Sequence, residues 1–510
     1  MKTYLIAHDL GTTGDKATLF SEDGELIRSV TKSYPTDFFS GNSAEQDPDD
    51  WWAAFCRANH ELLEGMDPFC IAAVSFSGQM MGCVAVDRGG VPLRKAIIWA
   101  DTRSSAQEKL LRERFDPVEF YHITGHRPSA SYSLAKLLWI RDNEKGVYSR
   151  LYKVLQPKDY IIYKLTGCFV TDFSDASGTN AFDIRSFCWS ERILGQLAIP
   201  SELFPEAYPS TKAAGKILKS VAAESGLAAG TLVVIGGGDG VCAAVGSGAV
   251  EEGDVYNYLG SSSWISVTSE QPVFDDSMRT FNWAHMLPGK FSPTGTMQAA
   301  GNSYSFVKNL LYDGRLPDES AQKNDIYGQM DVEMKKSVVG ANGLLFLPYL
   351  LGERSPRWNP RARGAFIGLS MEHNRGDLLR SAVEGIAMNL EIILKIVNHG
   401  SKKMQVRLIG GLAQSKVICQ ILADVFETTL ARMTHLEEAT SIGAAVAAGV
   451  GCGLYRDFSV VDSFIHIADM VLPNPADAAK YREIKCLFEE AYQALSDVFD
   501  KQYKYREGFN

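Results

Sequence analysis

Short apolar segments alternate with glycine-rich turns and with stretches of helical periodicity along most of the chain, which predicts an α/β protein. Two places follow the same plan of an apolar run, a tight turn rich in glycine and hydroxyl groups, and a second apolar run. The two turns are Asp9-Leu10-Gly11-Thr12-Thr13-Gly14 and Tyr258-Leu259-Gly260-Ser261-Ser262-Ser263. Each pattern predicts a β-hairpin. One such hairpin in each half of the chain indicates two related domains.

A turn of this kind directs backbone N–H groups and hydroxyls into one concavity, which suits phosphate oxygens. Only the first turn carries an acidic residue, Asp9, which would face a metal ion held by that phosphate. The alternative is a pair of ordinary hairpins, because short glycine-rich turns are common. The two hairpins therefore suggest a nucleotide site between two domains without establishing it.

Three apolar runs in the first half, residues 71–76, 96–99 and 232–235, predict buried strands. They end in Ser77-Gly78-Gln79, Ala100-Asp101-Thr102-Arg103 and Gly236-Gly237-Gly238-Asp239-Gly240. In open α/β sheets, ligands lie beyond the carboxyl ends of the strands. We therefore expect a site built from these three turns together with Asp9.

Asp239 follows a strand and three glycines and precedes a predicted helix. Glycine backbone lets a ligand approach closely, and a carboxylate there can accept a hydroxyl proton. The alternative is that Asp239 serves only as the N-cap of the helix. We place the domain boundary after this helix, at Glu251-Glu252-Gly253, which gives domains of residues 1–249 and 250–510.

Several other groups have both a functional and a structural interpretation. Gly410-Gly411, between a strand and a helix, is typical of a nucleotide contact at a helix N-terminus, but such turns often hold no ligand. Met80, Met81 and Trp99 either line a small-ligand pocket or fill the core. The segment Gly352-Glu353-Arg354-Ser355-Pro356 is either a brace at the domain interface, through an ion pair, or an exposed loop.

Composition narrows the class of protein. The 510 residues are 45% hydrophobic and 22% charged, as expected for a soluble globular protein of two large domains. The net charge of −10 argues against a nucleic-acid surface. Nine dispersed cysteines without C-x-x-C predict a reduced, cytoplasmic protein without disulfides or zinc. Neither a signal peptide nor an apolar stretch of about 20 residues is present, so we expect no membrane contact.

Common catalytic motifs are absent, including the P-loop, H-E-x-x-H and G-x-S-x-G. Taken together, the motifs that are present resemble those of the FGGY family of carbohydrate kinases, from about Thr3 to about Gly453. The matching stretches are Asp9-Leu10-Gly11-Thr12-Thr13, Phe76-Ser77-Gly78-Gln79-Met80, Ile98-Trp99-Ala100-Asp101-Thr102-Arg103, residues 131–143, Gly236-Gly237-Gly238-Asp239, residues 348–356, residues 363–369 and residues 410–415. Their order and spacing together are specific, whereas each alone is not.

The resemblance implies two duplicated actin-like (ribonuclease H-like) ATPase domains with an interdomain cleft, and ATP-dependent phosphorylation of a small sugar or polyol with Mg²⁺. It also implies a homodimer. It assigns Asp239 as the catalytic base and Asp9 as the metal residue. The implied ATP-binding residues are Gly11, Thr12, Thr13, Gly260, Ser261, Ser262, Gly410, Gly411, Gln414 and Ser415. The implied sugar-binding residues are Gln79, Met80, Met81, Trp99, Asp101, Asp239 and Gly240.

Within the family, the stretch Ser77-Gly78-Gln79-Met80 is most similar to the xylulose kinases, so the first expectation is conversion of D-xylulose to D-xylulose 5-phosphate. Two residues depart from that pattern: Met81 replaces a usual His, and Gly240 replaces a usual Asn. Both changes remove polar groups from the expected pocket, and such groups discriminate strongly between substrates. Another ketose such as ribulose, or a polyol such as a tetritol or glycerol, is therefore the alternative.

Two other classes share part of this pattern. An actin-like ATPase would have the phosphate hairpins but no sugar requirement, and the turns at Gln79, Trp99 and Asp239 argue against it. A sugar-sensing regulator would need a DNA-binding module, to which we assign no segment. Function has to be argued from the site and not from the fold.

Overall fold

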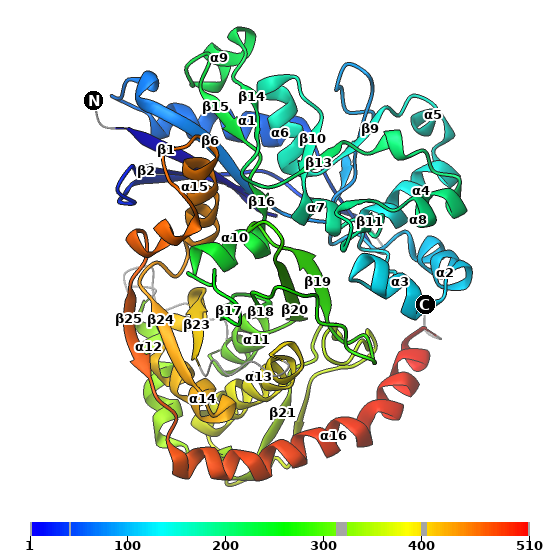
Figure 1. Ribbon diagram of the computed structural model, residues 1–510. Coiled ribbons are helices and arrows are strands. Elements are labelled where there is room, and N and C mark those ends of the chain that lie inside the picture. Colours follow the sequence, from blue (N-terminus) through cyan, green and yellow to red (C-terminus); the bar gives the residue numbers. More distant parts are fainter. Residues whose placement is uncertain (1–2, 40–41, 313–323, 399–404, 508–510) are drawn as a thin grey trace.

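The computed structural model describes residues 3–39, 42–312, 324–398 and 405–507. Two large mixed sheets organise the chain, one for each half of the sequence (Figure 1). The first has the order β14-β15-β6-β1-β2-β3, with β16 also paired to β6. Its strands are β1 Tyr4–Leu10, β2 Gly14–Ser21, β3 Leu26–Ser33, β6 Ile71–Gly78, β14 Ala213–Lys216, β15 Leu232–Val234 and β16 Gly237–Gly238.

The second sheet has the order β19-β20-β18-β17-β23-β24-β25. Its strands are β17 Val255–Leu259, β18 Ser263–Val267, β19 Phe281–Ala284, β20 Phe291–Met297, β23 Gln405–Ile409, β24 Thr429–Met433 and β25 Ile467–Val471. Both sheets contain an antiparallel hairpin, β1–β2 or β17–β18, whose first strand pairs in parallel with a later one, β6 or β23. The two hairpins predicted from the sequence are therefore confirmed, and they hold equivalent places in the two sheets.

Helices cover the sheets and form much of the remaining structure. Those of the first half are α1 Pro48–Leu62, α2 Ser105–Arg114, α3 Pro117–Thr124, α4 Ser133–Asn143, α5 Lys145–Tyr148, α6 Pro157–Thr166, α7 Phe173–Ser177, α8 Glu191–Leu197, α9 Lys219–Ser225 and α10 Asp239–Gly246. Those of the second half are α11 Gly301–Leu311, α12 Asn324–Lys336, α13 Arg375–Val397, α14 Lys416–Phe426, α15 Ala439–Gly451 and α16 Pro475–Glu507. Small sheets use β4 Asp37–Phe39, β5 Ser43–Gln46, β7 Val84–Val86, β8 Ala96–Ile97, β9 Lys153–Leu155, β10 Val170–Asp172, β11 Phe182–Asp183, β12 Cys188–Trp189, β13 Glu206–Tyr208, β21 Leu345–Leu347 and β22 Ala365–Ile367.

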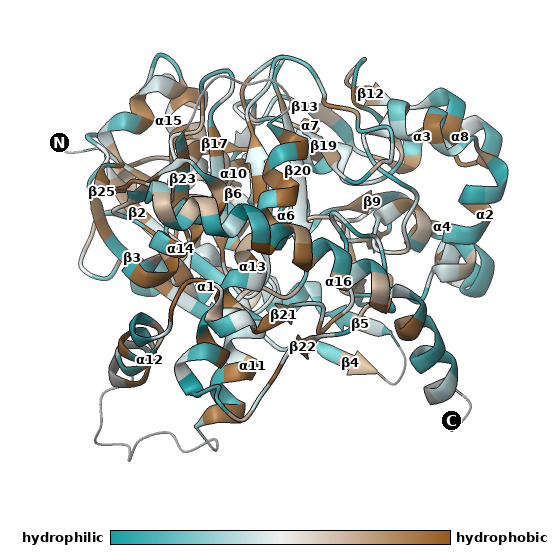
Figure 2. Ribbon diagram, turned by 90° about the horizontal axis from the view of Figure 1, so that it is seen from below, coloured by the Kyte–Doolittle hydropathy of each residue, from teal (hydrophilic) through white to brown (hydrophobic). Residues whose placement is uncertain are grey.

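Local sequence explains several helices. Asp47 caps α1 by accepting a hydrogen bond from the Asp49 N–H, and Pro48 occupies the first helical position, where its missing N–H does no harm. The last helix, α16, is amphipathic. Hydrophobic and hydrophilic residues alternate along it (Figure 2), and Tyr481 and Phe488 lie in the core of the second half. Among the described residues, no helix has the length and apolar character needed to cross a membrane.

Helix α15 belongs to the second half of the sequence but lies against β1, β6 and α10 of the first half (Figure 1). The backbones of α10 and α15 approach closely, because a Cβ on Gly443 would lie 2.0 Å from the Cys242 carbonyl oxygen. Most side chains between residues 439 and 449 are small, which allows the two helices to pack this closely. The chain therefore crosses back to the first sheet, so that both halves meet at the carboxyl ends of β1 and β6.

One predicted strand differs from the observed structure. Residues 96–99 were expected to form a buried strand alongside 71–76 and 232–235. The strand found, β8, covers only Ala96–Ile97 and pairs with β5 in a separate three-stranded sheet. Burial on both sides made this run resemble a central strand, although its hydrogen-bond partner is a short peripheral strand.

Candidate active site

Asp239 is the first residue of α10 and directly follows the two-residue strand β16. The cap position belongs to Gly238, so the interpretation of Asp239 as an N-cap is wrong. A Cβ on Gly238 would lie 2.4 Å from the Met80 sulfur, so glycine is needed for this close approach. The backbone thereby places the Asp239 carboxylate at the end of the first sheet.

The Asp239 side chain accepts a hydrogen bond of 2.7 Å from the Gly240 N–H. Burial, followed by the negative charge of Asp9, raises the pKa of Asp239 to about 7. A carboxylate with a pKa near neutrality can accept and release a proton under physiological conditions. The environment of Asp239 therefore suits a general base.

Three pockets adjoin one another in this region, and Asp239 lines two of them. The aromatic pocket has a volume of about 400 Å³ and includes Asp239 in its lining. The junction pocket, of about 360 Å³, also includes Asp239, together with Asp9. The tyrosine pocket, of about 620 Å³, shares Tyr258 and Gly411 with the junction pocket. Asp239 thus lies where the first two pockets meet, and the third continues the tract into the second half of the chain.

Five predicted sugar-side residues, namely Met80, Met81, Trp99, Asp239 and Gly240, line the aromatic pocket. Met81 has a left-handed backbone with φ of 64°, and the buried Lys136 ammonium donates to its carbonyl oxygen at 2.7 Å. This bond holds a backbone conformation that methionine rarely adopts. Lys136 therefore stabilises the part of the pocket wall that Met81 forms.

The other two predicted sugar-side residues, Gln79 and Asp101, are not among the lining residues. The Gln79 amide donates to the Gly11 carbonyl at 3.2 Å and to the Gln46 side chain at 2.8 Å. The Asp101 carboxylate accepts a hydrogen bond of 2.6 Å from the Ala44 N–H and pairs with Arg103 at 2.7 Å. Both side chains support neighbouring loops in this structure, and Gln79 supports the first phosphate-type turn.

Sequence reasoning missed the wall of the aromatic pocket that the second half supplies. This wall consists mainly of aromatic and polar residues from β17, β18, β19 and β20 and the segments beyond them, namely Tyr256, Trp264, Phe281, Trp283, Ser292, Thr294, Thr296, Gln298, Asn302, Leu351 and Arg354. Strand alternation marks some of them as facing one side of the sheet, but only the packing of two domains shows what they face.

Arg354 does not play the part expected of it, which was an ion pair that braces the domain interface. Its guanidinium lies 5.9 Å from the centre of the Phe281 ring and lines the aromatic pocket, and within the described part of the chain no ion pair of Arg354 is found. Glu353 instead accepts hydrogen bonds from the N–H groups of Gln298 and Arg354, both within 2.9 Å. Burial raises the pKa of Glu353 to about 8. This segment therefore delivers a cation to the pocket.

The junction pocket contains Asp9 and Gly11 from the first hairpin and Gly410 and Gly411 from the second half. One Asp9 oxygen accepts a hydrogen bond from the Ser77 hydroxyl at 2.8 Å, and the other accepts one from the Thr440 hydroxyl at 2.7 Å. Lys16, which the sequence analysis did not select, also lines this pocket. Its position two residues after the turn Asp9–Gly14, on the returning strand, was the available signal.

Thr12 and Thr13 do not line the junction pocket. The Thr12 hydroxyl accepts a hydrogen bond of 2.9 Å from the Trp99 indole, which ties the first hairpin turn to the aromatic pocket. The Thr13 carbonyl accepts a bond from the Tyr34 N–H at 3.3 Å. Both residues belong to the turn between β1 and β2 that borders the pocket, and Thr13 is exposed.

The tyrosine pocket brings together several of the predicted ATP residues, namely Gly260, Ser261, Gly411, Gln414 and Ser415, while Ser262 lies on the aromatic side. Gly410 adopts φ of 95°, and a Cβ there would lie 2.7 Å from the Leu259 carbonyl group, so the turn requires glycine. Ser415 donates to the Asp331 carboxylate at 2.7 Å and caps α14. Tyr304 and Tyr327 stack with ring centres 6.3 Å apart, and this aromatic wall was not predicted.

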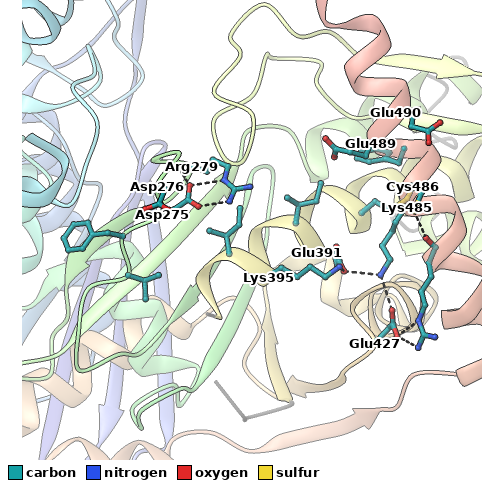
Figure 3. A pocket seen from close by; sticks show the side chains of 17 residues that line it. Asp275, Asp276, Arg279, Glu391, Lys395, Glu427, Lys485, Cys486, Glu489 and Glu490 are labelled. Carbon is teal, nitrogen blue, oxygen red and sulfur yellow. Dashed lines mark hydrogen bonds and ion pairs between the residues drawn. The ribbon is translucent and has the colours of Figure 1, made fainter. Parts of the chain in front are cut away.

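A larger hollow of about 1080 Å³ lies between the loop of Asp275 and Arg279 and helices α13 and α16 (Figure 3). Its charged groups neutralise one another, since Lys485 pairs with Glu391 at 3.1 Å and Arg279 with Asp275 at 2.6 Å. It shares no lining residue with the three pockets around Asp239. The size of a pocket therefore does not identify the active site. The larger hollow contains neither Asp9 nor Asp239.

The junction pocket can be tested for its fit to Mg²⁺. Within the described ranges, no group of three or more His, Cys, Asp or Glu side chains could enclose a metal ion. Mg²⁺ is usually held by one or two carboxylates together with substrate phosphates, and keeps several waters. Asp9 and Asp239 both line this pocket and supply oxygen ligands of the required kind. The residues fit a metal ion that arrives with a nucleotide.

Comparison with known proteins agrees with this geometry. Residues 4–246 match the N-terminal domain, and residues 255–452 the C-terminal domain, of the FGGY family of carbohydrate kinases. The chain is 32% identical over 504 residues to a xylulose kinase from Staphylococcus epidermidis, with 98% of each chain covered.

Two solved structures from Lactobacillus acidophilus are similar over nearly their whole length. A ligand-bound xylulose kinase has a TM-score of 0.90 at 28% identity, with 98% of this chain and 99% of that chain covered. A gluconate kinase has a TM-score of 0.90 at 27% identity, with 98% and 100% covered. The two matched domains and the equivalent hairpins confirm the expected actin-like fold and the ATP-dependent sugar kinase activity. The chain belongs to the FGGY family of carbohydrate kinases.

Proposed function

We propose that this kinase transfers the γ-phosphoryl group of ATP to a terminal hydroxyl of a small sugar, with D-xylulose as the first candidate. The observation that carries the proposal is the place of Asp239, which is shared by the aromatic pocket and the junction pocket. A sugar hydroxyl reaching Asp239 from one pocket would meet a phosphate reaching it from the other.

In this proposal the sugar lies in the aromatic pocket, and Asp239 accepts the proton of the attacking hydroxyl. The aromatic rings cover the C–H faces of the sugar, and Ser292, Thr294 and Gln298 offer hydrogen bonds to its hydroxyls. Phosphoryl transfer needs mainly positioning and electrostatic stabilisation from the protein. The raised pKa of Asp239 suits its role as the proton acceptor.

ATP lies across the junction and tyrosine pockets. The turns of Gly11 and Gly260 direct backbone N–H groups toward the phosphates, and Lys16 adds a positive charge at the junction. The adenosine lies beside Gly411, Gln414 and Ser415, at the start of α14. Asp9 would hold Mg²⁺, which would supply positive charge against the phosphates. Closure of the two domains would exclude water from this tract.

Two kinds of observation bear on which sugar is the substrate. Similarity to xylulose kinases at about 30% identity supports D-xylulose. Arg354 favours a second candidate, an aldonate such as D-gluconate, because its guanidinium lines the pocket with no carboxylate partner in the described part of the chain. A guanidinium binds a carboxylate through two parallel hydrogen bonds. Similarity to a gluconate kinase of known structure supports the same candidate.

The test is sugar-dependent ADP formation from Mg²⁺·ATP with D-xylulose, D-ribulose, erythritol, glycerol and D-gluconate, against a blank without sugar. Turnover with D-xylulose above all others would support the first candidate, and preference for D-gluconate would support the second. Steady hydrolysis in the blank that no sugar increases would contradict the kinase proposal and favour an actin-like ATPase.

A further inference from the structure

A buried serine anchors the backbone immediately before Asp239. The Gly238 N–H donates a hydrogen bond of 2.9 Å to the Ser174 hydroxyl oxygen. Ser174 is fully buried in α7, which lies beside β16 (Figure 1). It does not line the aromatic, junction or tyrosine pocket.

The position of Asp239 depends on such an anchor. Its own side chain makes one hydrogen bond within the described chain, to the N–H of its neighbour Gly240. The preceding residues, Gly237 and Gly238, have no side chains that could hold the segment by packing. Their strand β16 pairs only with the end of β6. Among the described residues, the Ser174 hydroxyl accepts a hydrogen bond from the Gly238 N–H, and the Cys242 thiol donates one of 3.5 Å to the Gly237 carbonyl oxygen. Ser174 therefore makes the side-chain hydrogen bond that lies nearest to Asp239 along this backbone.

The direction of the Ser174 hydroxyl is set by Asp172. The hydroxyl donates to one Asp172 oxygen at 2.5 Å, which leaves its lone pairs for the Gly238 N–H. The same Asp172 oxygen also accepts a hydrogen bond of 2.9 Å from the Ser210 hydroxyl. Its other oxygen pairs with the Lys158 ammonium at 2.9 Å. The orientation of one hydroxyl is thus held by a carboxylate that is itself fixed on both sides.

Lys158, which pairs with Asp172, is itself held by two further carboxylates. It pairs with Asp159 at 2.8 Å and with Asp175 at 3.1 Å, and all of these side chains are fully buried. Burial opposes its charge, but the three neighbouring carboxylates raise the pKa of Lys158 well above the usual value, so it stays charged. A Cβ on Gly78 would lie 3.3 Å from the Lys158 Cβ, so the same lysine also packs under the end of β6.

We propose that Ser174, oriented by Asp172 and Lys158, is a positioning residue that holds the Asp239 carboxylate in its reactive place. This inference rests on the proposed role of Asp239 as the base. Small displacements of a reacting group reduce the rate of reaction far more than they reduce substrate binding. Loss of the Ser174 hydroxyl should therefore affect kcat more than KM.

The chain offers a matched control, since Ser174→Ala and Ser210→Ala each remove one buried hydroxyl from the same Asp172 oxygen. Only Ser174 also holds Gly238. We expect kcat to fall about 10- to 100-fold in Ser174→Ala and less than about 3-fold in Ser210→Ala, with KM for sugar and ATP changed less than about 3-fold in both.

Ser174→Cys serves if Ser174→Ala fails to fold, because a thiol nearly preserves the volume but is a weak hydrogen-bond acceptor. Equal kcat values for the Ser174 and Ser210 variants would overturn the inference. Asp239→Asn, measured alongside, separates this failure from failure of the proposed function. If Asp239→Asn turns over normally, the assignment of the base is wrong. If it is inactive while the two serine variants behave alike, only the role of Ser174 is wrong.

Discussion

Asp9 and Asp239 line the same pocket, and the charge of Asp9 adds to burial in raising the pKa of Asp239 to about 7. Asp9 lies near the end of β1, in the first hairpin, and Asp239 is the first residue of α10. Their separate hydrogen-bond partners give them different surroundings, since Asp9 is held by Ser77 and Thr440. Neighbouring carboxylates in different surroundings are suited to different roles.

The raised pKa of Asp239 should govern the pH dependence of catalysis. A base must be deprotonated, so kcat/KM should fall as the pH falls through about 7, the pKa of Asp239 in the free protein. Asp9→Asn removes a like charge and should move this acidic limb to lower pH by several tenths of a unit or more. Initial rates between about pH 5 and 9, at saturating Mg²⁺, measure both. An unchanged limb in Asp9→Asn would contradict the coupling.

The same pKa predicts an effect on stability. Because the pKa of Asp239 is raised in the folded state, the folded protein binds more protons than the unfolded chain between about pH 4 and 7, and stability is lost as the pH rises through this range. Asp239→Asn removes this loss. We expect its Tm to exceed that of the wild type by about 2 °C or more at pH 8, with a smaller difference at pH 5. Calorimetry of both proteins at the two pH values is the measurement, and a difference independent of pH would argue against the raised pKa.

Gly240→Asn tests one departure from the xylulose-kinase pattern. A Cβ at this position would meet no atom within 4 Å, so we expect the variant to fold with nearly the wild-type Tm. The added amide would lie beside Asp239 and offer a hydrogen bond to a substrate hydroxyl. We expect kcat/KM for D-xylulose to rise relative to that for erythritol or glycerol by about 10-fold. Unchanged selectivity with normal folding would show that residue 240 does not contact the substrate.

Arg354 separates the two candidate substrates. If a carboxylate is bound, Arg354→Gln should reduce kcat/KM for D-gluconate by about 10- to 100-fold, because a charge-assisted hydrogen bond contributes about 1.5–3 kcal/mol. The loss for D-xylulose should be smaller. Parallel assays with both sugars compare the variant with the wild type. Equal losses for the two sugars would assign Arg354 to the shape of the pocket and not to the recognition of charge.

Local sequence predicted those parts of the site that lie within single turns. The hairpin turns at Gly11 and Gly260, the turn at Gly410 and the position of Asp239 each depend on residues close together in the chain. Backbone that approaches a ligand or another strand closely favours glycine, so these turns are marked by composition. The same locality explains why the two hairpins were recognised as a pair.

Features that depend on distant segments were not accessible in this way. The aromatic wall of Phe281 and Trp283 faces Asp239 only because the two sheets meet. Helix α15 packs against β1, from which more than 400 residues of chain separate it. Gln79 turns toward Gln46, a partner 33 positions away. Arg354 was selected from its motif, but the direction of its side chain follows from the packing around Phe281.

The most direct test of the account is the turnover of Asp239→Asn with Mg²⁺·ATP and the best sugar substrate, together with calorimetric ATP binding. The variant preserves the shape of the side chain but removes its ability to accept a proton. The account predicts that kcat falls by about 10²- to 10⁴-fold while the Kd for ATP changes less than about 3-fold. A kcat within about 10-fold of the wild type, in a folded variant that binds ATP, would contradict the role of Asp239 as the base.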